Sequence, residues 1–370
     1  DAVSNPEAPV IDQVRSDYLE NTIKVFGLRY KARVLPKVNV SFPVTSNNVL
    51  YFNYSHSMRL PHPRFLYAGL DPVYQDRSFL SFLGNPDLNP EVNISYEIGF
   101  KSQIGKNLGL TVAAYNNNRF DYIVSRKVIV NDQTGRPVSK TMYINQDYAK
   151  VQGAEVNVIW KITPQIKIFG NIAYQLAKGK SNSARESSLQ IAQNGEVPLS
   201  TENYLAWDRP WNVNLGTVFT PDSNATYYSN WMRGLQIYMS SSYQSGFRYT
   251  PMILEGYNAL GRPEYATDLT NFLEERATPW INADIKLTKT FAGKNKKGIT
   301  LSVEVRNLFD NKRSQIINPV TGRAWEPGDD VPNNWRDDRY LGPEESGLPP
   351  NNPARYQPPR QILFGLLFRL

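Results

Sequence analysis

The chain has 370 residues and a net charge of +7, with 41 Lys or Arg against 34 Asp or Glu. It has no cysteine, which excludes a disulfide scaffold, a zinc–cysteine site and thiol catalysis, and its two histidines argue against a multi-histidine metal centre. No uncharged apolar run reaches about 18 residues, which excludes a bundle of transmembrane helices. The densest run of lysines, at 294–297, stands between glycines and is typical of a solvated hairpin tip rather than a nucleic-acid surface.

The first 30 residues precede the regular pattern of the chain. They begin DAVSNPEAPV, without an initiator Met, a basic n-region or an apolar h-region. This start is expected either after removal of a signal peptide or in an internal fragment of a longer protein, and the strand pattern favours the fragment. The stretch NTIKVFGLRY, residues 21–30, predicts either an extra strand or the rim of an external loop.

Alternation of apolar and polar residues dominates from residue 31 to residue 370, and helical periodicity is nearly absent. Every second residue is apolar in 92–100, 281–288 and 299–306, and the residues between are polar or Gly. Further copies of the pattern lie at 166–176, 211–219, 235–240 and 361–370. All of these segments are expected to be strands with one apolar and one polar face.

Short turns and long polar loops alternate between the expected strands. Short turns are predicted at 44–48, 105–107, 163–165, 221–230 and 293–298. Long loops are predicted at 58–90, 128–140, 178–206, 247–276 and 310–357. All long loops then leave the same end of the sheet, which is the organisation of an outer-membrane barrel with short periplasmic turns and long external loops.

Strand length and side-chain chemistry agree with a sheet that crosses a membrane. The strands span about 10–14 residues, whereas a soluble strand averages about 5–6 and a membrane-spanning one needs about 9–11. Aromatic residues favour any strand, but those near strand ends are interpreted as interfacial girdles: Tyr51, Tyr54, Tyr115, Tyr122, Trp160, Trp207, Trp211 and Trp280. Hydrocarbon offers no hydrogen bonds to the backbone, so the sheet must close on itself and the charged residues of its polar face must line the lumen. This set comprises Glu97, Glu155, Asp284, Lys286, Glu304 and Arg306.

The pattern yields about eleven strands. Bacterial single-chain barrels have an even number of strands, so an odd set that starts from an external segment is not expected to close alone. Eleven strands suit half of a 22-stranded barrel, a size found in transporters with a plugged lumen. The fold class expected is therefore all-β, a transmembrane antiparallel β-barrel of which the chain supplies about half.

Several stretches, in the family's order, resemble the C-terminal half of a TonB-dependent receptor. The segments NPDLNPE (85–91) and YEIGF (96–100) resemble the family's N-P-x-L-x-P-E…Y-E-x-G-F strand entry. The segment 112–123 is similar to its A-Y-x-x-x-x-x-D-x-I strand, and 145–155 resembles its N-x-x-x-x-x-x-G-x-E strand. WDRPWNV (207–213) resembles a D-x-R-H-like strand start, with Pro210 and Trp211 where the family often has His, and VRNLFDN (305–311) resembles the family's V-x-N-L-F-D/N strand end.

The last strand resembles the terminal signal that the barrel-insertion machinery reads. Its alternating apolar residues are Phe364, Leu366, Phe368 and Leu370, with Leu at the end where Phe is commoner. The long Pro-rich final loop, which ends in NPARY (352–356) before Pro358 and Pro359, resembles that of the Oar-like branch, whose members carry an N-terminal carboxypeptidase-regulatory-like domain.

The resemblance implies residence in the outer membrane of a Gram-negative bacterium and energised import. External loops would capture a ligand, and a plug inside the barrel would be remodelled by the inner-membrane TonB complex. Plug and TonB box are N-terminal in the family and neither is found here, so residues 31–370 are expected to be the C-terminal part of the barrel. Outer-membrane lipids, the insertion machinery and an unidentified small-molecule, glycan or peptide ligand are the expected partners; no nucleic acid, cofactor, metal or catalytic residue is expected.

The loops offer candidate sites of low specificity. His56 and His62 lie near Arg59, Arg64 and Asp71, where a loop-borne hydrolase is conceivable, yet no G-x-S-x-G or P-loop pattern accompanies them. The loop 310–357 gathers acids without EF-hand spacing, at Asp329, Asp330, Asp337, Asp338, Glu344 and Glu345. Aromatic loop residues that can stack on a ligand are Tyr67, Tyr204, Tyr249, Trp325 and Trp335, with Tyr74 and Tyr257 also in loops. A passive porin or an adhesion barrel is the main alternative to a transporter, ahead of the hydrolase.

Overall fold

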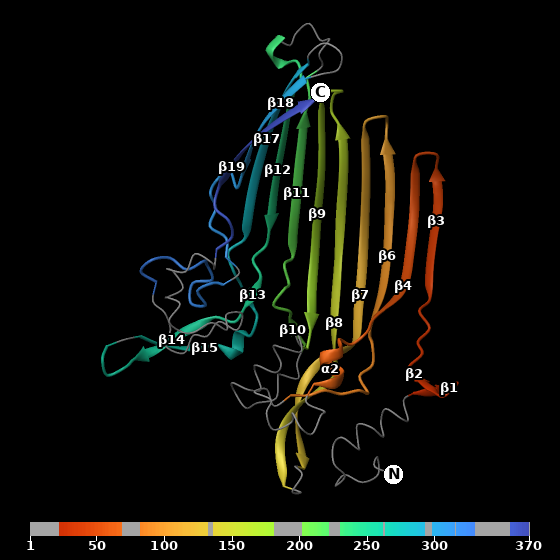
Figure 1. Ribbon diagram of the computed structural model, residues 1–370, viewed down its shortest axis with the longest axis vertical. Coiled ribbons are helices and arrows are strands. Elements are labelled where there is room, and N and C mark those ends of the chain that lie inside the picture. Colours follow the sequence, from red (N-terminus) through yellow and green to blue (C-terminus); the bar gives the residue numbers. More distant parts are fainter. Residues whose placement is uncertain are drawn as a thin grey trace.

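The fold is a single curved wall of antiparallel strands with irregular segments at one end (Figure 1). It comes from a computed structural model. None of the helices in the described residues has the length and apolar character of a membrane span. The described residues are 22–68, 82–131, 136–180, 202–221, 230–261, 263–292, 298–314, 316–329 and 356–369.

Eleven strands follow one another along the wall in the described part, each paired with its neighbours in the antiparallel sense. In chain order they are β3 (Lys37–Thr45), β4 (Asn48–Arg59), β6 (Glu91–Ile104), β7 (Leu108–Asn131), β8 (Pro137–Lys161), β9 (Ile166–Gly179), β11 (Trp211–Phe219), β12 (Leu235–Gln244), β17 (Trp280–Ala292), β18 (Gly298–Arg306) and β19 (Gln361–Arg369). Two short strands, β5 (Phe82–Leu83) and β10 (Asn203–Tyr204), attach to β8 and β9 beside this path.

Register confirms the alternation that defines the two faces. Ile98 pairs with Phe52 and with Ala114, and this apolar row continues across the wall to Ile281 and Ile285. The six expected lumen residues occupy the opposite, polar face, because Glu97, Glu155, Asp284, Lys286, Glu304 and Arg306 all fall on the alternate register. Large apolar side chains stay exposed on the first face, as Ile98 and Leu366 do at 53% and 58%.

The two ends of the wall differ as expected. Short turns lie at one end, shown uppermost in Figure 1, and the irregular connections lie at the other. Three of the predicted turns are present at residues 46–47, 105–107 and 162–165, while 222–229 and 293–297 lie outside the described residues. The position of the connections therefore agrees with external loops at one end and tight turns at the other.

The predicted loop at 128–140 is wrong. β7 continues to Asn131 and β8 begins at Pro137, so these two strands reach 24 and 25 residues and project beyond their neighbours (Figure 1). A register shift between Arg119 and Ile123 marks the start of the projection. Residues 128–130 are three consecutive apolar residues and polar residues follow them, so the alternation that identifies a half-buried strand is absent from this stretch of sequence.

Several short strands and helical turns lie outside the main sheet, most of them at its loop end. β1 (Ile23–Val25) and β2 (Leu28–Tyr30) form a separate hairpin, not a further strand of the wall. β14 (Met252–Tyr257) and β15 (Pro263–Thr267) form a second hairpin, and β13 (Arg248–Tyr249) pairs with β16 (Glu275–Arg276). The helical pieces are α2 (Pro63–Tyr67), η2 (Asn230–Met232) and η3 (Leu269–Asn271), of which η2 lies at the turn end.

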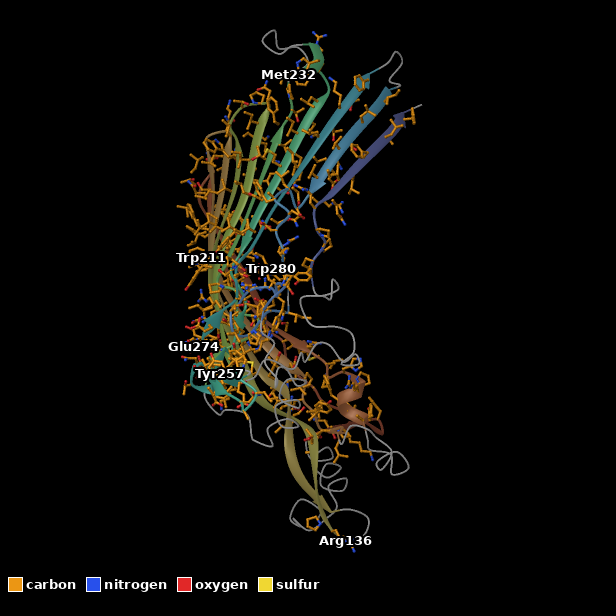
Figure 2. The ribbon with its side chains drawn as sticks, turned by 90° about the vertical axis from the view of Figure 1, so that its left-hand side faces the viewer. Arg136, Trp211, Met232, Tyr257, Glu274 and Trp280 are labelled. Carbon is orange, nitrogen blue, oxygen red and sulfur yellow. The ribbon has the colours of Figure 1, made fainter. Side chains whose placement is uncertain are left out.

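Aromatic residues divide between the two faces, which corrects the expectation that all of them are interfacial. Trp211 stands on the apolar face against Tyr174, with ring centroids 4.8 Å apart, while Trp280 pairs with Gln244 on the polar face (Figure 2). Tyr51 and Tyr115 likewise lie on the polar face. On the apolar face, Ile281 and Phe291 are ten residues apart on β17, about 33 Å along the strand or about 25 Å at a tilt of about 40°, which matches the apolar band of an outer-membrane barrel.

Candidate functional site

A shallow trough of about 460 Å³ lies on the polar face at mid-wall. Its polar groups are mainly amides and hydroxyls, from Asn157, Asn171, Asn214, Ser240, Ser242 and Asn282, with Asp284 as the acid, while apolar carbon supplies the larger share of its surface. Asn171 donates to Asn157 at 2.8 Å, and Asn282 donates to Asp284 at 3.0 Å. Phe169 and Tyr238 stack at the trough with centroids 6.2 Å apart, so it presents polar and aromatic surfaces together.

Glycines on the polar face make room for aromatic rings of the adjacent strand. A Cβ added to Gly216 would lie 2.2 Å from the Phe169 ring, and one added to Gly99 would lie equally close to Tyr51. Each ring therefore lies flat over the neighbouring backbone. The rings therefore stay close to the sheet surface and do not fill the trough.

Charged side chains of the polar face pair with one another near the β19 edge. Glu304 contacts Lys286 at 3.2 Å and Arg306 at 2.6 Å. These three residues were expected on the lumen side, and together, with one carboxylate between two cations, they carry a net charge of +1. The trough itself offers amide and hydroxyl hydrogen bonds and the single carboxylate of Asp284.

A cation–aromatic group lies above the trough, at the loop end of the wall. The Arg209 guanidinium carbon is 4.2 Å from the Trp280 ring centroid and 5.4 Å from that of Phe247. Arg209 also donates to Gln244 at 2.5 Å. Because Trp280 and Gln244 belong to the polar face, this group borders the entrance to the trough.

A buried ion pair lies at the edge of β9, between the stretch paired with β10 and the stretch paired with β11. Asp208 accepts from the Ala177 amide at 2.8 Å and from Arg248 Nε at 3.1 Å. Arg248 in turn donates to the Glu274 carbonyl at 2.6 Å. The carboxylate thus takes the place of a missing strand neighbour and ties β9 to the loops after β12.

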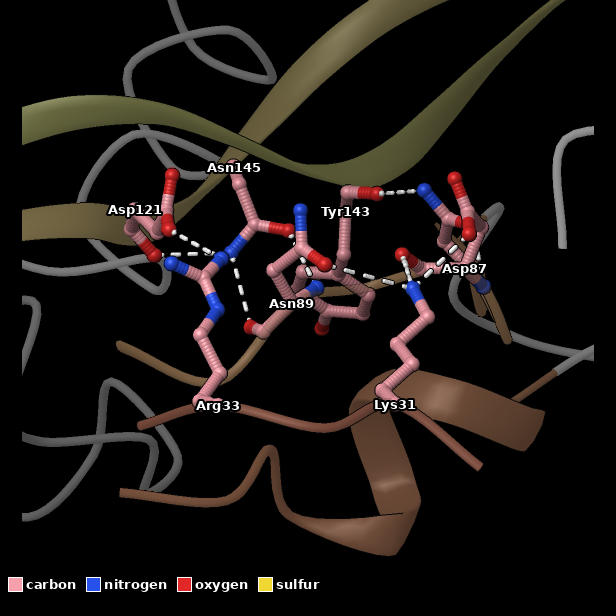
Figure 3. A network of polar contacts seen from close by, with 8 residues as sticks. Lys31, Arg33, Asp87, Asn89, Asp121, Tyr143 and Asn145 are labelled. Carbon is pink, nitrogen blue, oxygen red and sulfur yellow. Dashed lines mark hydrogen bonds and ion pairs between the residues drawn. The ribbon is translucent and has the colours of Figure 1, made fainter. Parts of the chain in front are cut away.

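A second polar network joins the sequence motifs at the rim (Figure 3). The Asn145 side chain donates to the carbonyls of Asn89 and Asp121, at 3.0 and 2.7 Å, and accepts from the Asn89 amide at 2.7 Å. Lys31 pairs with Asp87 at 2.8 Å and Arg33 with Asp121 at 2.9 Å. The N-P-D-L-N-P-E segment and Asn145 therefore fix the segment before β3 to the base of the β7–β8 projection.

The loop 316–329 folds on itself and packs on the loops after β12. Arg323 pairs with Asp329 at 2.7 Å, and the Gly322 carbonyl accepts from Thr278 at 2.9 Å. Burial opposes ionisation of Asp329, but the Glu326 amide and the Arg323 guanidinium outweigh it and lower the pKa of that carboxyl. Among the described residues no group of acids or histidines is arranged to hold a metal ion.

The candidate aromatic residues have different surroundings. Tyr67 ends α2 and is 65% exposed, so it remains available for ligand contact. Tyr204 lies between Lys178 and Arg248, at 4.7 and 3.6 Å from its ring centroid. Tyr249 is half-buried against Gly322, and burial raises the pKa of its phenol. Trp325 is 1% exposed and belongs to the interior of its loop, not to a ligand surface; Trp335 lies outside the described residues.

The two histidines are far from a catalytic arrangement. His56 belongs to β4 on the apolar face, and its Nε2 lies 2.5 Å from the Tyr54 hydroxyl. His62 caps α2 by accepting from the Arg64 amide at 3.2 Å. Asp71, Tyr74 and the acids Asp330, Asp337, Asp338, Glu344 and Glu345 lie outside the described residues, as does Leu370. Phe364, Leu366 and Phe368 share the apolar face of β19.

Comparison with known proteins decides the family. Residues 11–308 match the family model "TonB dependent receptor-like, beta-barrel". The chain belongs to the TonB-dependent receptor family. Its members are receptors and transporters of the Gram-negative outer membrane, so the apolar face is the lipid face and the polar face lines the lumen.

Individual relatives are similar over part of their length. The "Iron-regulated outer membrane virulence protein" of Vibrio cholerae is 30% identical over 113 residues, which is 29% of this chain and 17% of that protein. Among solved structures, the transporter YddB of Escherichia coli aligns with a TM-score of 0.53 and 15% identity over 76% of this chain and 38% of its own. The ferric enterobactin receptor PfeA of Pseudomonas aeruginosa aligns with a TM-score of 0.54 and 15% identity over 90% and 39%. The chain thus spans well under half of these relatives, and the structural likeness establishes the fold.

Proposed function

We propose that the chain forms part of an outer-membrane transporter, which binds a ligand at its external loops and imports it with energy from the inner-membrane TonB complex. The observation that carries this proposal is the polar lumen face, whose trough of amide and aromatic groups lies below loops gathered at one end of the wall. A wall of this kind suits a polar ligand that passes from loops to lumen.

The open edges support the expected division of the barrel. β3 and β19 each have one strand neighbour in the described part of the chain, so each leaves a row of backbone groups unpaired. In hydrocarbon each unpaired group costs several kcal/mol. Strands outside this chain would pair with both edges and complete the barrel, and an N-terminal plug would lie against the trough.

The ligand remains one of three chemical classes: a small molecule, a glycan or a peptide. Relatives named for ferric enterobactin and for copper show what other members of the fold carry. Here Tyr67 and Tyr249, at the loop end, are the candidate contacts that the structure leaves at least partly accessible, whereas Tyr204 pairs with Lys178 on the outward face of the wall.

Conductance and uptake distinguish a transporter from a porin. The full-length protein that carries this chain, inserted into planar bilayers, is expected to conduct few ions, because a plug fills its lumen. Cells that produce it should accumulate ferric enterobactin, a glycan or a peptide from a labelled panel only with a functional TonB. A large steady conductance, or uptake that persists without TonB, would instead establish a passive channel.

A further inference from the structure

Two lysines face each other on the outward surface just beyond the apolar band. Lys150 of β8 pairs directly with Lys178 of β9 in the strand register. Both lie on the lipid-facing side of the wall, since they share their face with Ala154 and Tyr174. Like charges directly opposite each other destabilise a strand pair.

Tyrosines and a further cation extend this outward cluster. Lys178 Nζ lies 4.7 Å from the Tyr204 ring centroid, and Arg248 lies 3.6 Å from the same ring. Lys180 lies 6.0 Å from the Tyr148 ring. Lysines beside aromatic rings at a membrane surface are the usual chemistry of an interface that contacts lipid headgroups.

The positive charge of this cluster is not balanced by the described residues. Asp208 neutralises Arg248, but no ion pair among the described residues includes Lys150, Lys178 or Lys180. The neighbouring acid, Glu202, accepts a hydrogen bond from Tyr148 at 2.7 Å. An anion held between the two opposed lysines would remove their repulsion.

The height of the cluster identifies the source of that anion. Tyr174 and Trp211, paired on the outward face at the external end of their strands, are interpreted as part of the aromatic girdle at the membrane interface. Lys178 follows Tyr174 by four residues, about 13 Å along the strand and less across a tilted wall. This is the level of the headgroups, which occupy several Å on each side of the hydrocarbon. Lipid phosphates at this level would lie beside these ammonium groups, on the side of the wall away from the lumen.

We propose that Lys150 and Lys178, with Lys180 and the rings of Tyr148 and Tyr204, form a binding site for the phosphate of an outer-leaflet lipid. The site is independent of the transported ligand, because it lies outside the barrel. It depends on the outer-membrane location and not on the mechanism of import.

The test measures lipid binding to the full-length protein in detergent. After removal of bound lipid, lipid A with both phosphates is titrated in mixed micelles, and bound lipid is counted by native mass spectrometry. Lys150→Gln with Lys178→Gln should weaken binding at least about tenfold, since each surface cation contributes measurably to attraction of anionic lipid. Lipid A without phosphates should bind the unaltered protein as weakly as the phosphorylated form binds the variant.

A matched control exists on the same two strands. Lys161 and Lys167 are also directly opposed, but near the periplasmic turn and on the lumen face. Lys161→Gln with Lys167→Gln should leave lipid binding unchanged. Equal losses in both double variants, or no loss in either, would overturn the proposal, as would full competition by inorganic phosphate at millimolar concentration.

Reversal of the charge at position 178 gives a second test, in which thermal stability is measured with and without lipid. Lys178→Glu creates an opposed ion pair with Lys150, so without lipid the variant should melt at or above the temperature of the unaltered protein. With phosphorylated lipid A, the unaltered protein should gain thermal stability and the variant should not. A variant that is less stable without lipid would show that a carboxylate of the protein already balances Lys178, and would overturn the proposal.

Discussion

Asp208 and Arg248 form an ion pair of 3.1 Å with side chains 0% and 5% exposed, although forty residues separate them in the chain. The pair replaces strand pairing where the chain between β10 and β11 leaves the edge of β9. A backbone amide that would otherwise be unsatisfied there is bound by the carboxylate instead. The loop end of the lumen wall therefore depends on this contact.

Arg248→Met is expected to lower the free energy of unfolding by about 3–5 kcal/mol, because it leaves the Asp208 carboxylate buried without its cation. Urea unfolding in lipid vesicles measures the change. Arg33→Met is the control, since the Arg33–Asp121 pair is 37% and 32% exposed and should contribute less than about 1 kcal/mol. Similar losses for both variants would contradict the role given to the buried pair.

Gly246→Ala should displace the segment between β12 and β13. A Cβ at this position would lie 1.6 Å from the backbone carbonyl oxygen of Ala277, which cannot move aside like a side chain. Gly256→Ala is the control, because nothing lies within 4 Å of its added Cβ. External protease should cut the loop 247–276 faster in Gly246→Ala than in the control; identical cleavage patterns would refute the tight contact.

Acid should loosen the loop 316–329. The pKa of Asp329 is lowered below its ordinary value of 3.8 in the folded protein, so its contacts stabilise the loop above pH 3.8 and are lost as the pH falls through the lower folded value. Quenching of Trp325 by acrylamide should rise over that window in a variant whose other tryptophans are replaced by Phe. In Asp329→Asn the quenching should no longer change with pH over the same window.

The orientation of the wall predicts which positions are labelled on intact cells. Tyr257 is 68% exposed on the β14–β15 hairpin at the loop end, whereas Lys106 lies in the turn between β6 and β7. The chain has no cysteine, so single substitutions report one position each. A membrane-impermeant maleimide should label Tyr257→Cys but not Lys106→Cys; the reverse result would invert the topology.

Sequence reasoning was most successful where alternation is strict. In residues 92–100 and 281–288 every side chain lies on the face that its polarity indicates, because the strand period fixes the face once one member is placed. It failed at 128–140, where β7 and β8 extend beyond their neighbours and the sequence does not alternate between apolar and polar residues. It also gave no sign of Arg209 on Trp280 or of Asp208 with Arg248, since such contacts depend on which strands become neighbours.

Aromatic residues show the same limit. Trp211 and Trp280 both stand at strand starts, yet register places one toward lipid and the other above the lumen trough. Glycines opposite rings, such as Gly216 under Phe169, mark lumen positions only once the pairing of strands is known. A single sequence thus predicts faces within a strand better than contacts between strands.

The central claim, that one face of the wall meets lipid and the other lines a polar lumen, is tested most directly along β17. Spin labels at single cysteines from 281 to 288, in the full-length protein in vesicles, report accessibility to oxygen and to a water-soluble nickel chelate. Odd positions such as Ile281, Ile285 and Leu287 should be accessible to oxygen, and even ones such as Asn282, Asp284 and Lys286 should not. A period of two with this phase supports the account; uniform accessibility, or the opposite phase, would contradict it.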